Sequence, residues 1–297
     1  MTAFAASALA ASAWSGFFAS HTVRTALLVG SVVAVICAMI GCLVVLQADA
    51  FSAHALADLG AVGGAGAFLI GVNQLAGFLI ASLIFGWVME GIGVRRIRER
   101  DTVTGLVLGT GLGLTALFLY LGSQLNSSTS TMSVLFGSLF SVLPNAPYMI
   151  SVLGLVVVVA LILFGRQMML VCVDESLAQA AGVHVRLIRL AFTTCLSLAV
   201  ALSSYSIGAV LSTALIVIPA SAAMSISHGT GRTMARAAAL GVLAVWVGTA
   251  LSYASYGWTA HHANWPVSFW IVVVVAFEWL ATRLVTFCRA RLTRGNR

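Results

Sequence analysis

A histidine and an aspartate four residues apart, His54 and Asp58, are the first residues whose types and spacing point to chemistry. They lie between two long apolar runs, Ala26–Leu46 and Ala61–Met89. On a helix this spacing places both side chains on one face, one turn apart. Ionisable groups at membrane depth usually face a bundle interior or an aqueous path, and both types bind divalent transition metals. The pair is therefore either a metal-ligand pair or a helix end where the two side chains satisfy each other near the lipid headgroups.

A second polar stretch, residues 166–189, is the longest inside the chain. Its centre reads as a short amphipathic helix, because Asp174 and Glu175 stand where acids favour a helix N-terminus and Gly182 stands where a glycine closes one. It is either an ordinary solvated loop or a short cytoplasmic helix of the kind that receives a mechanical push from a soluble partner.

Other acids near the apolar runs are weaker candidates for a site. Glu90 and Glu278 have arginines nearby in the sequence, Arg95 and Arg283, so we expect ion pairs at headgroup level. Asp49 is expected in the turn before the helix that carries His54. These acids therefore rank below the His54–Asp58 pair.

Catalytic motifs are missing from this sequence. It contains no P-loop, no GxSxG and no HExxH, so we expect neither ATP hydrolysis by this chain nor a Ser/His membrane protease. The five cysteines form no CxxC pair, which argues against a zinc knuckle or a disulfide framework. We expect a protein that is not an enzyme and holds no permanently bound cofactor.

The composition places the chain in a membrane. Of its 297 residues, 61% are hydrophobic and 8% are charged, whereas soluble domains carry about a quarter charged residues. The apolar runs are continuous, which favours helices over the alternating strands of a barrel. The net charge of +7 comes from arginines in short loops, so it reports orientation and not nucleic-acid binding. The expected fold class is an all-α polytopic membrane protein with a single domain over residues 1–297.

Run lengths and breakers predict about nine transmembrane helices. The expected crossings are residues 25–47, 53–71, 74–93, 102–122, 148–165, 187–204, 207–225, 232–255 and 267–286. The crossing at 207–225 is open to a break at Gly208 or Pro219. The apolar piece Thr131–Leu143 is too short to cross and is expected to be re-entrant or interfacial.

The arginines predict an orientation. They fall in residues 95–100, 166–189 and 232–236 and in the basic tail 287–297, so these segments should be cytoplasmic. With nine crossings the N-terminus is then outside and the C-terminus inside. Residues 1–22 read as an interfacial N-terminal segment. His261 and His262 fall in an external loop with tryptophans, which is typical of an interfacial belt.

Five segments, taken in order, resemble the membrane permease of bacterial zinc and manganese ABC importers, a family related to the cobalamin and siderophore permeases. They are Gly41-Cys-Leu-Val-Val-Leu46, Asp101-Thr-Val-Thr-Gly105, Leu135-Phe-Gly-Ser-Leu139, the stretch from Val173-Asp-Glu175 to Gly182-Val183, and Ile207-Gly-Ala-Val-Leu-Ser-Thr-Ala-Leu-Ile-Val-Ile-Pro-Ala220. The resemblance runs from about Thr25 to Leu284.

This resemblance implies a fold similar to type II ABC importers and a set of partners. A separate cytoplasmic ABC ATPase dimer would supply hydrolysis, an extracellular solute-binding protein would capture the cargo, and a second permease copy would complete a homodimer in the cytoplasmic membrane. His54 and Asp58 would be ligands on the path of a manganese or zinc ion. Asp174, Glu175, Ala178 and Gly182 would belong to the helix that couples to the ATPase.

One departure from the family pattern concerns the candidate ligands. The family reads Phe-Leu-Gly-Asp-Ala-Leu-Ser-His-Ala, whereas this chain reads Phe51-Ser-Ala-His-Ala-Leu-Ala-Asp58-Leu, so the aspartate and the histidine have exchanged places. Two alternatives to a free metal ion stay open. The same fold would import a metal chelate, a haem-like compound or another small solute, or an ion-coupled secondary transporter would use the pair as a proton relay.

Overall fold

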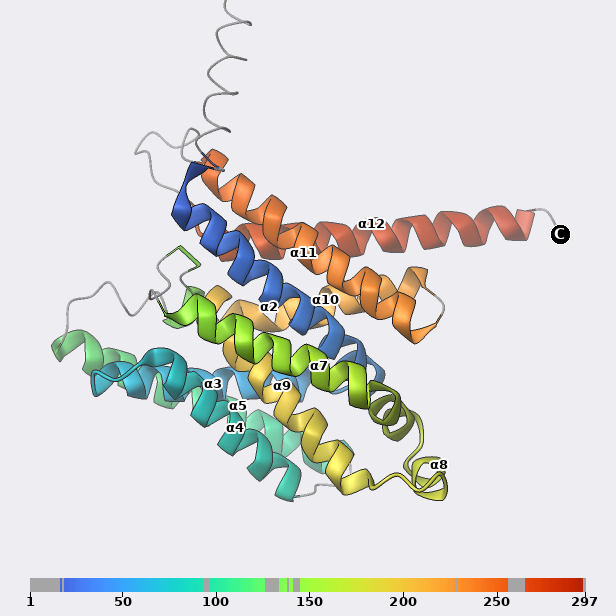
Figure 1. The fold of residues 1–297 in the computed structure, drawn as a ribbon, viewed down its shortest axis with the longest axis horizontal. Coiled ribbons are helices and arrows are strands. Elements are labelled where there is room, and N and C mark those ends of the chain that lie inside the picture. The colour runs from blue at the N-terminus through green and yellow to red at the C-terminus, as the bar shows by residue number, and fades with distance from the viewer. Residues whose placement is uncertain are drawn as a thin grey trace, which may run out of the picture.

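The computed structural model describes residues 17, 19–92, 97–125, 134–137, 139–140, 145–227, 229–255 and 265–295. Its regular elements in this part of the chain are all helices (Figure 1). Nine are long: α2 (His21–Leu46), α3 (Ala50–Leu69), α4 (Gln74–Ile92), α5 (Ile97–Leu125), α7 (Ala146–Val173), α9 (Val185–Ile207), α10 (Ala209–Ile226), α11 (Thr230–Ser255) and α12 (Val267–Gly295). The tenth, α8 (Glu175–Ala180), is a short helix between α7 and α9.

The nine long helices correspond to the nine predicted crossings. Eight of them are long and apolar enough to span a membrane. The last of the eight, α12, continues to Gly295, past the predicted end at residue 286. The exception is α3, in which His54, Asp58 and several glycines interrupt the apolar sequence. Helix α3 instead lies buried among its neighbours, which is where a polar helix is tolerated inside a membrane bundle. The predicted all-α, multi-pass fold class is confirmed.

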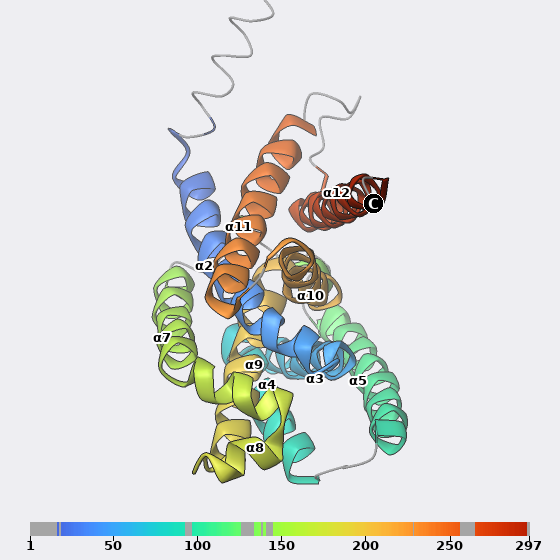
Figure 2. The ribbon, with the colours of Figure 1, turned by 90° about the vertical axis from the view of Figure 1, so that its right-hand side faces the viewer.

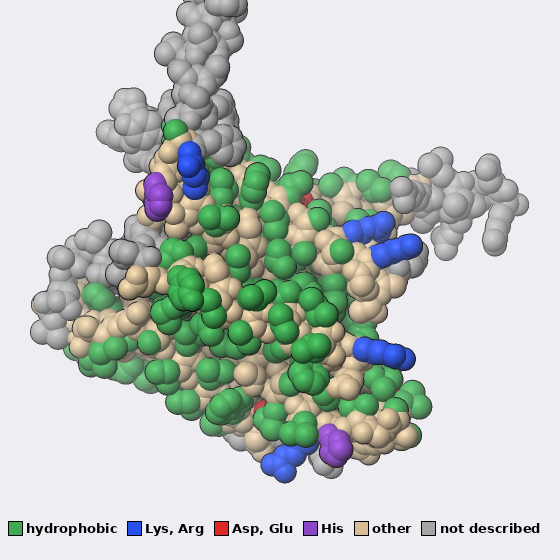
Figure 3. Space-filling view, viewed as in Figure 1, with side chains coloured by type: hydrophobic (Ala, Val, Ile, Leu, Met, Phe, Trp, Pro, Cys, Tyr) green, Lys and Arg blue, Asp and Glu red, His purple; other side chains and the backbone are tan. Residues whose placement is uncertain are grey.

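Helix α2 forms the centre of the bundle (Figure 2). It packs against α7, α9, α10 and α11, and its side chains Val33, Ile36, Ile40 and Leu43 are fully buried. The outer helices have the opposite pattern, because large apolar side chains such as Ile162 on α7 and Phe277 on α12 are exposed. Hydrophobic side chains cover much of the visible face (Figure 3). An apolar exterior of this extent is expected of a protein whose solvent is lipid.

Small residues allow close packing at two helix seams. A Cβ atom at Gly63 on α3 would lie 2.3 Å from the backbone oxygen of Gly77 on α4, and one at Gly41 on α2 would lie 1.9 Å from that of Ile216 on α10. Close approach through small residues is the usual device for helix association in membranes. Gly105, Gly109 and Gly113 on α5 have no described atom within 4 Å of such a Cβ, so they form no close seam within one copy of the chain.

The break between α9 and α10 falls at Gly208, while α10 continues through Pro219. Gly208 has a φ of +106° and Gly137 a φ of +74°, a backbone region that favours glycine. A Cβ atom on either glycine would come within 2.3 Å of the other segment's backbone. Two of the segments that carry the family resemblance therefore cross here at backbone contact.

Several predictions fall outside the described residues. They concern most of the interfacial segment 1–22, most of the re-entrant piece 131–143, the loop that holds His261 and His262, and the arginines of residues 93–96.

Candidate metal path and coupling helix

Helix α3 presents His54 and Asp58 on one face, as their spacing predicts. The His54 Nε2 and Asp58 Oδ2 atoms are 3.9 Å apart. The Asp58 side chain is 2% exposed and the His54 side chain is 33% exposed. Asp49 is the residue just before α3, as predicted. The pair therefore combines a buried carboxylate with an imidazole that is open on one side.

A threonine from α10 fixes the His54 ring. The Nδ1 atom of His54 lies 2.9 Å from the hydroxyl oxygen of Thr213. When Nδ1 carries the proton and donates it to Thr213, Nε2 is left with a free lone pair directed toward Asp58. A ligating histidine is commonly oriented in this way by a hydrogen bond from its other ring nitrogen. Sequence reasoning missed Thr213, because it lies 159 residues away in the chain.

The geometry of the pair suits a cation. The Oδ2 atom of Asp58 is buried and has no hydrogen-bond donor among the described residues, and a buried carboxylate oxygen is costly without one. Two metal–ligand bonds of about 2.0–2.2 Å each span at most about 4.0–4.3 Å. A separation of 3.9 Å therefore lets a single ion contact both atoms. No cluster of three or more His, Cys, Asp or Glu side chains with metal-binding geometry occurs in the described part of the chain, so His54 and Asp58 are candidate ligands as a pair only.

Helices α5 and α10 border this pair. Thr213 comes from α10, and Gly111 on α5 brings that backbone close, because a Cβ atom there would lie 3.7 Å from the Asp58 carbonyl carbon. Gly111 thus packs closely on α3, whereas Gly105, Gly109 and Gly113 of the same helix have no described atom within 4 Å of such a Cβ. The pair lies where α3, α5 and α10 meet.

A separate cavity of about 860 Å³ lies on the other side of α3. From α3 it is lined by Ser52, Leu56 and Leu59, which are about half a helical turn away from His54 and Asp58. Helices α4, α5, α7, α8 and α9 supply most of the remaining wall. This cavity is therefore distinct from the candidate metal pair, and nothing in the sequence pattern predicts it.

The predicted coupling segment is a helix, α8. Asp174 caps it: its Oδ1 accepts from the Ser176 backbone nitrogen at 2.8 Å and from the Leu177 nitrogen at 3.3 Å. The Ser176 hydroxyl also donates to Asp174 Oδ1. This hydroxyl, as the largest cause, and the two amides hold the pKa of the Asp174 carboxyl below its usual value, because they stabilise its charged form. Gly182 has the predicted left-handed backbone, with a φ of +78°, and Ala178 is fully buried.

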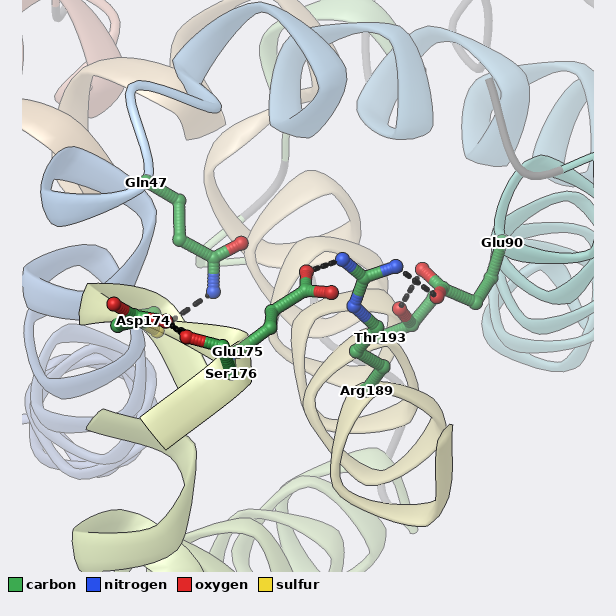
Figure 4. Close-up of polar contacts among 8 residues, drawn as sticks. Gln47, Glu90, Asp174, Glu175, Ser176, Arg189 and Thr193 are labelled. Atoms are coloured by element: carbon green, nitrogen blue, oxygen red, sulfur yellow. Dashed lines mark hydrogen bonds and ion pairs between the residues drawn. The ribbon is translucent and has the colours of Figure 1, made fainter. Parts of the chain in front are cut away.

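An arginine joins α8 to α4 (Figure 4). On α9, Arg189 forms an ion pair with Glu175, and its Nη1 atom lies 3.9 Å from Glu90 Oε1. The Thr193 hydroxyl, one turn along α9, donates to Glu90 Oε2 at 3.3 Å. Arg95 lies outside the described residues, so its predicted pair with Glu90 is not tested. Among the described residues, Arg189 lies beside Glu90. The contact with Arg189 could not be read from sequence proximity, because it depends on α4 turning Glu90 toward α9.

The second predicted headgroup pair is wrong. The guanidinium of Arg283 lies over the Trp279 ring, 5.4 Å from its centroid. Both carboxylate oxygens of Glu278 are buried and lack a hydrogen-bond partner among the described residues. Arg283 and Glu278 lie five positions apart, so a helix directs them to different faces.

Comparison with known proteins adds the family. The sequence matches the ABC 3 transport family over residues 19–280. The chain belongs to the ABC 3 transport family. As a member of this transport family, it is a membrane subunit of a transporter and not itself an enzyme, and it is a multi-pass bacterial membrane protein.

Individual ABC 3 relatives are distant in sequence. The manganese import system permease protein ScaB of Streptococcus parasanguinis is 24% identical over 233 residues, which cover 78% of this chain and 82% of that protein. The chelated iron transport system membrane protein YfeC of Yersinia pestis is 26% identical over 229 residues, which cover 77% of this chain and 76% of YfeC.

The fold of this ABC 3 chain is similar to a solved structure, PsaBC from Streptococcus pneumoniae in complex with Fab. The TM-score is 0.79 at 21% identity, and the match covers 92% of this chain and 94% of that chain. The predicted resemblance to a metal-type ABC importer permease is confirmed.

Proposed function

We propose that this chain is the permease subunit of an ABC importer that moves a divalent transition metal ion, manganese or zinc, across the bacterial cytoplasmic membrane. One observation carries the proposal: His54 Nε2 lies within reach of one ion with Asp58 Oδ2, which is buried and has no hydrogen-bond donor among the described residues. The relative ScaB, named as a manganese import permease, supports manganese.

The His54–Asp58 pair would act as a transient ligand set. An imidazole and a carboxylate bind divalent transition metals, but a transported ion must also leave, so binding has to be weak. Two side chains, with water completing the coordination, meet both needs. The exchange of the aspartate and the histidine relative to the family pattern keeps both ligand types on one face of α3.

A second permease copy would complete the path. The His54 imidazole is one-third exposed on the surface of a single chain, and open, partly polar sites inside a membrane need a protein or aqueous neighbour. We place the path between two copies, with α3, α5 and α10 of each copy facing it. ATP-driven approach of two ATPase subunits would open it alternately to the two sides of the membrane.

Helix α8 would receive the push of the ATPase. Its cap Asp174, its first residue Glu175, its buried Ala178 and its closing Gly182 make a rigid, short element outside the long helices. It lies at the end of the bundle where α7 ends and α9 begins (Figure 1). With that end in the cytoplasm, the N-terminus is outside and the C-terminus inside, and an extracellular binding protein delivers the ion to the other end.

A metal chelate is the second candidate cargo. It is favoured by the relative YfeC, whose name refers to chelated iron. In that case His54 and Asp58 would hold each other in place and would not ligate the cargo.

Uptake by the reconstituted complex tests the proposal. The permease, its ATPase and its binding protein are placed in proteoliposomes, and uptake of free ⁵⁴Mn²⁺, ⁶⁵Zn²⁺ and a chelated iron complex is compared with and without ATP. ATP-dependent uptake of a free ion, abolished by a membrane-impermeant chelator, is the expected result. Uptake of the chelate alone would show that the cargo is a metal chelate and not a free ion. Uptake without the ATPase would refute an ABC importer.

A further inference from the structure

The contacts of Arg189 extend beyond a single ion pair. Its two terminal nitrogens contact different carboxylates on different helices: Nη2 pairs with Glu175 on α8, and Nη1 lies 3.9 Å from Glu90 on α4. A planar guanidinium presents several donors in a fixed fork, so one side chain holds two acids at once. Arg189 itself stands near the start of α9. Three helices thus meet at one side chain (Figure 4).

This three-helix bridge lies along the edge of a hollow. Glu90, Glu175, Arg189 and Thr193 all line the cavity of about 860 Å³. Close-packed side chains would resist a displacement of α8 toward α4, whereas a cavity leaves room for it. Among the described residues, Arg189 supplies the ion pair that links α8 to another helix. Arg189, Glu175 and Glu90 therefore form a polar link between α8 and α4 beside this cavity, and we call this link the strut.

Helix α4, which carries Glu90, packs closely on both α9 and α3. One turn before Glu90, Gly86 packs so tightly on α9 that a Cβ atom there would lie 2.2 Å from the Ser197 hydroxyl. Nearer the start of α4, the backbone of Gly77 lies against the backbone of Gly63 on α3. Helix α3 carries His54 and Asp58. A contiguous series of contacts thus runs from α8 through Arg189 and α4 to the helix with the candidate ligands.

We propose that Arg189 is the positioning residue that transmits movement of α8 to α4, and through α4 to α3, during transport. The inference rests on the proposed function, in which α8 receives the push of the ATPase. The ion pairs are half exposed, with side-chain exposures of 45% for Arg189, 46% for Glu175 and 27% for Glu90. Such pairs change an equilibrium by only about 1.5- to 5-fold each, so the strut reforms readily in every cycle.

Arg189→Lys is the variant that separates a strut from a simple charge. Lysine keeps the positive charge and much of the length, but its ammonium is a point charge without the fork, so it holds one carboxylate at a time. Arg186→Lys is the matched control, because Arg186 lies three positions before Arg189 on α9 and has no ion pair among the described residues. Glu90→Gln and Glu175→Gln remove the two ends of the strut singly and together.

Hydrogen–deuterium exchange on the permease in nanodiscs reads the strut without any transport assay. We expect Glu90→Gln, a change on α4, to raise amide exchange in residues 174–182 by about 1.5- to 5-fold. Arg189→Lys should do the same, and Arg186→Lys should not. Unchanged exchange at α8 in both Glu90→Gln and Arg189→Lys would refute the strut, whatever the cargo is.

The role of Arg189 in transport is tested by the ratio of ions transported to ATP hydrolysed in the complete complex. We expect this ratio to fall in Arg189→Lys while ATP hydrolysis continues, and we expect the double glutamine variant to lose no more than either single one, because the two ends act as a unit. A normal ratio in Arg189→Lys, or additive losses, would overturn the inference. If instead the wild-type complex transports nothing, the proposed function fails and the exchange result still decides the strut.

Discussion

The hydrogen bond between His54 and Thr213 provides a graded test of the candidate metal pair. Thr213→Val removes the hydroxyl that lies 2.9 Å from Nδ1 and nearly keeps the shape of the side chain. The ring then loses its orientation and the preference for the tautomer that leaves Nε2 free for a metal ion. Metal affinity should fall, and the apparent KM for the ion should rise.

The magnitude follows from the geometry. A neutral hydrogen bond contributes about 0.5–1.5 kcal/mol, which corresponds to about 2- to 12-fold in an equilibrium constant. Because one-third of the His54 side chain is exposed, water replaces part of the lost bond. We therefore expect the lower half of the range, a rise in KM of about 2- to 5-fold.

Initial rates of ATP-dependent ⁵⁴Mn²⁺ uptake into proteoliposomes, at equal amounts of permease, measure this change. Thr213→Ser is the matched control, because it keeps the hydroxyl, and it should retain a KM close to that of the wild type. An unchanged KM in Thr213→Val, or the same loss in Thr213→Ser, would refute the reasoning, since the hydroxyl would then have no part in presenting His54.

Three further outcomes are expected. Ala178→Trp overfills a fully buried position of α8 and should abolish uptake while membrane insertion, measured by quantitative immunoblot, is kept; Leu155→Trp, at a 64% exposed position on α7, should transport normally. The pKa of the Asp174 carboxyl is lowered, so its stabilisation of α8 is complete above the usual carboxyl pKa and is lost as the pH falls through the lowered pKa. Amide exchange in α8 should therefore rise only below about pH 4. Asp174→Ala should show this faster exchange at neutral pH. Gly63→Leu should destabilise the α3–α4 seam by more than about 3 kcal/mol in thermal unfolding, because its Cβ atom would meet α4 backbone at 2.3 Å, whereas Gly113→Leu should leave the melting temperature unchanged.

The helices could be predicted from the sequence because a bilayer fixes the length of an apolar run, and α8 could be predicted because its cap and its closing glycine act locally. The face shared by His54 and Asp58 also follows from spacing alone. Thr213 and Arg189 could not be found in this way. Their contacts depend on which helices are neighbours and how each is rotated, and no local pattern in one helix encodes that.

Glu90 illustrates the limit most clearly. The nearest arginine along the chain, Arg95, lies outside the described residues, and the contact that the structure shows, with Arg189 on α9, depends on how α4 is rotated. The packing of the glycines on α5 depends in the same way on how that helix is rotated. Gly111 packs against α3 while Gly105, Gly109 and Gly113, on the same helix, face open space.

The central claim is that a divalent ion passes between His54 and Asp58, and electron spin echo spectroscopy of bound Mn²⁺ tests it most directly. The complete complex is loaded with Mn²⁺, and nitrogen modulation of the Mn²⁺ echo is recorded for the wild type, for His54→Gln and for Asp58→Asn. We expect imidazole modulation in the wild type, its loss in His54→Gln, and weaker Mn²⁺ binding in Asp58→Asn. Imidazole modulation that persists in His54→Gln, or Mn²⁺ binding that is unchanged in both variants, would contradict the claim.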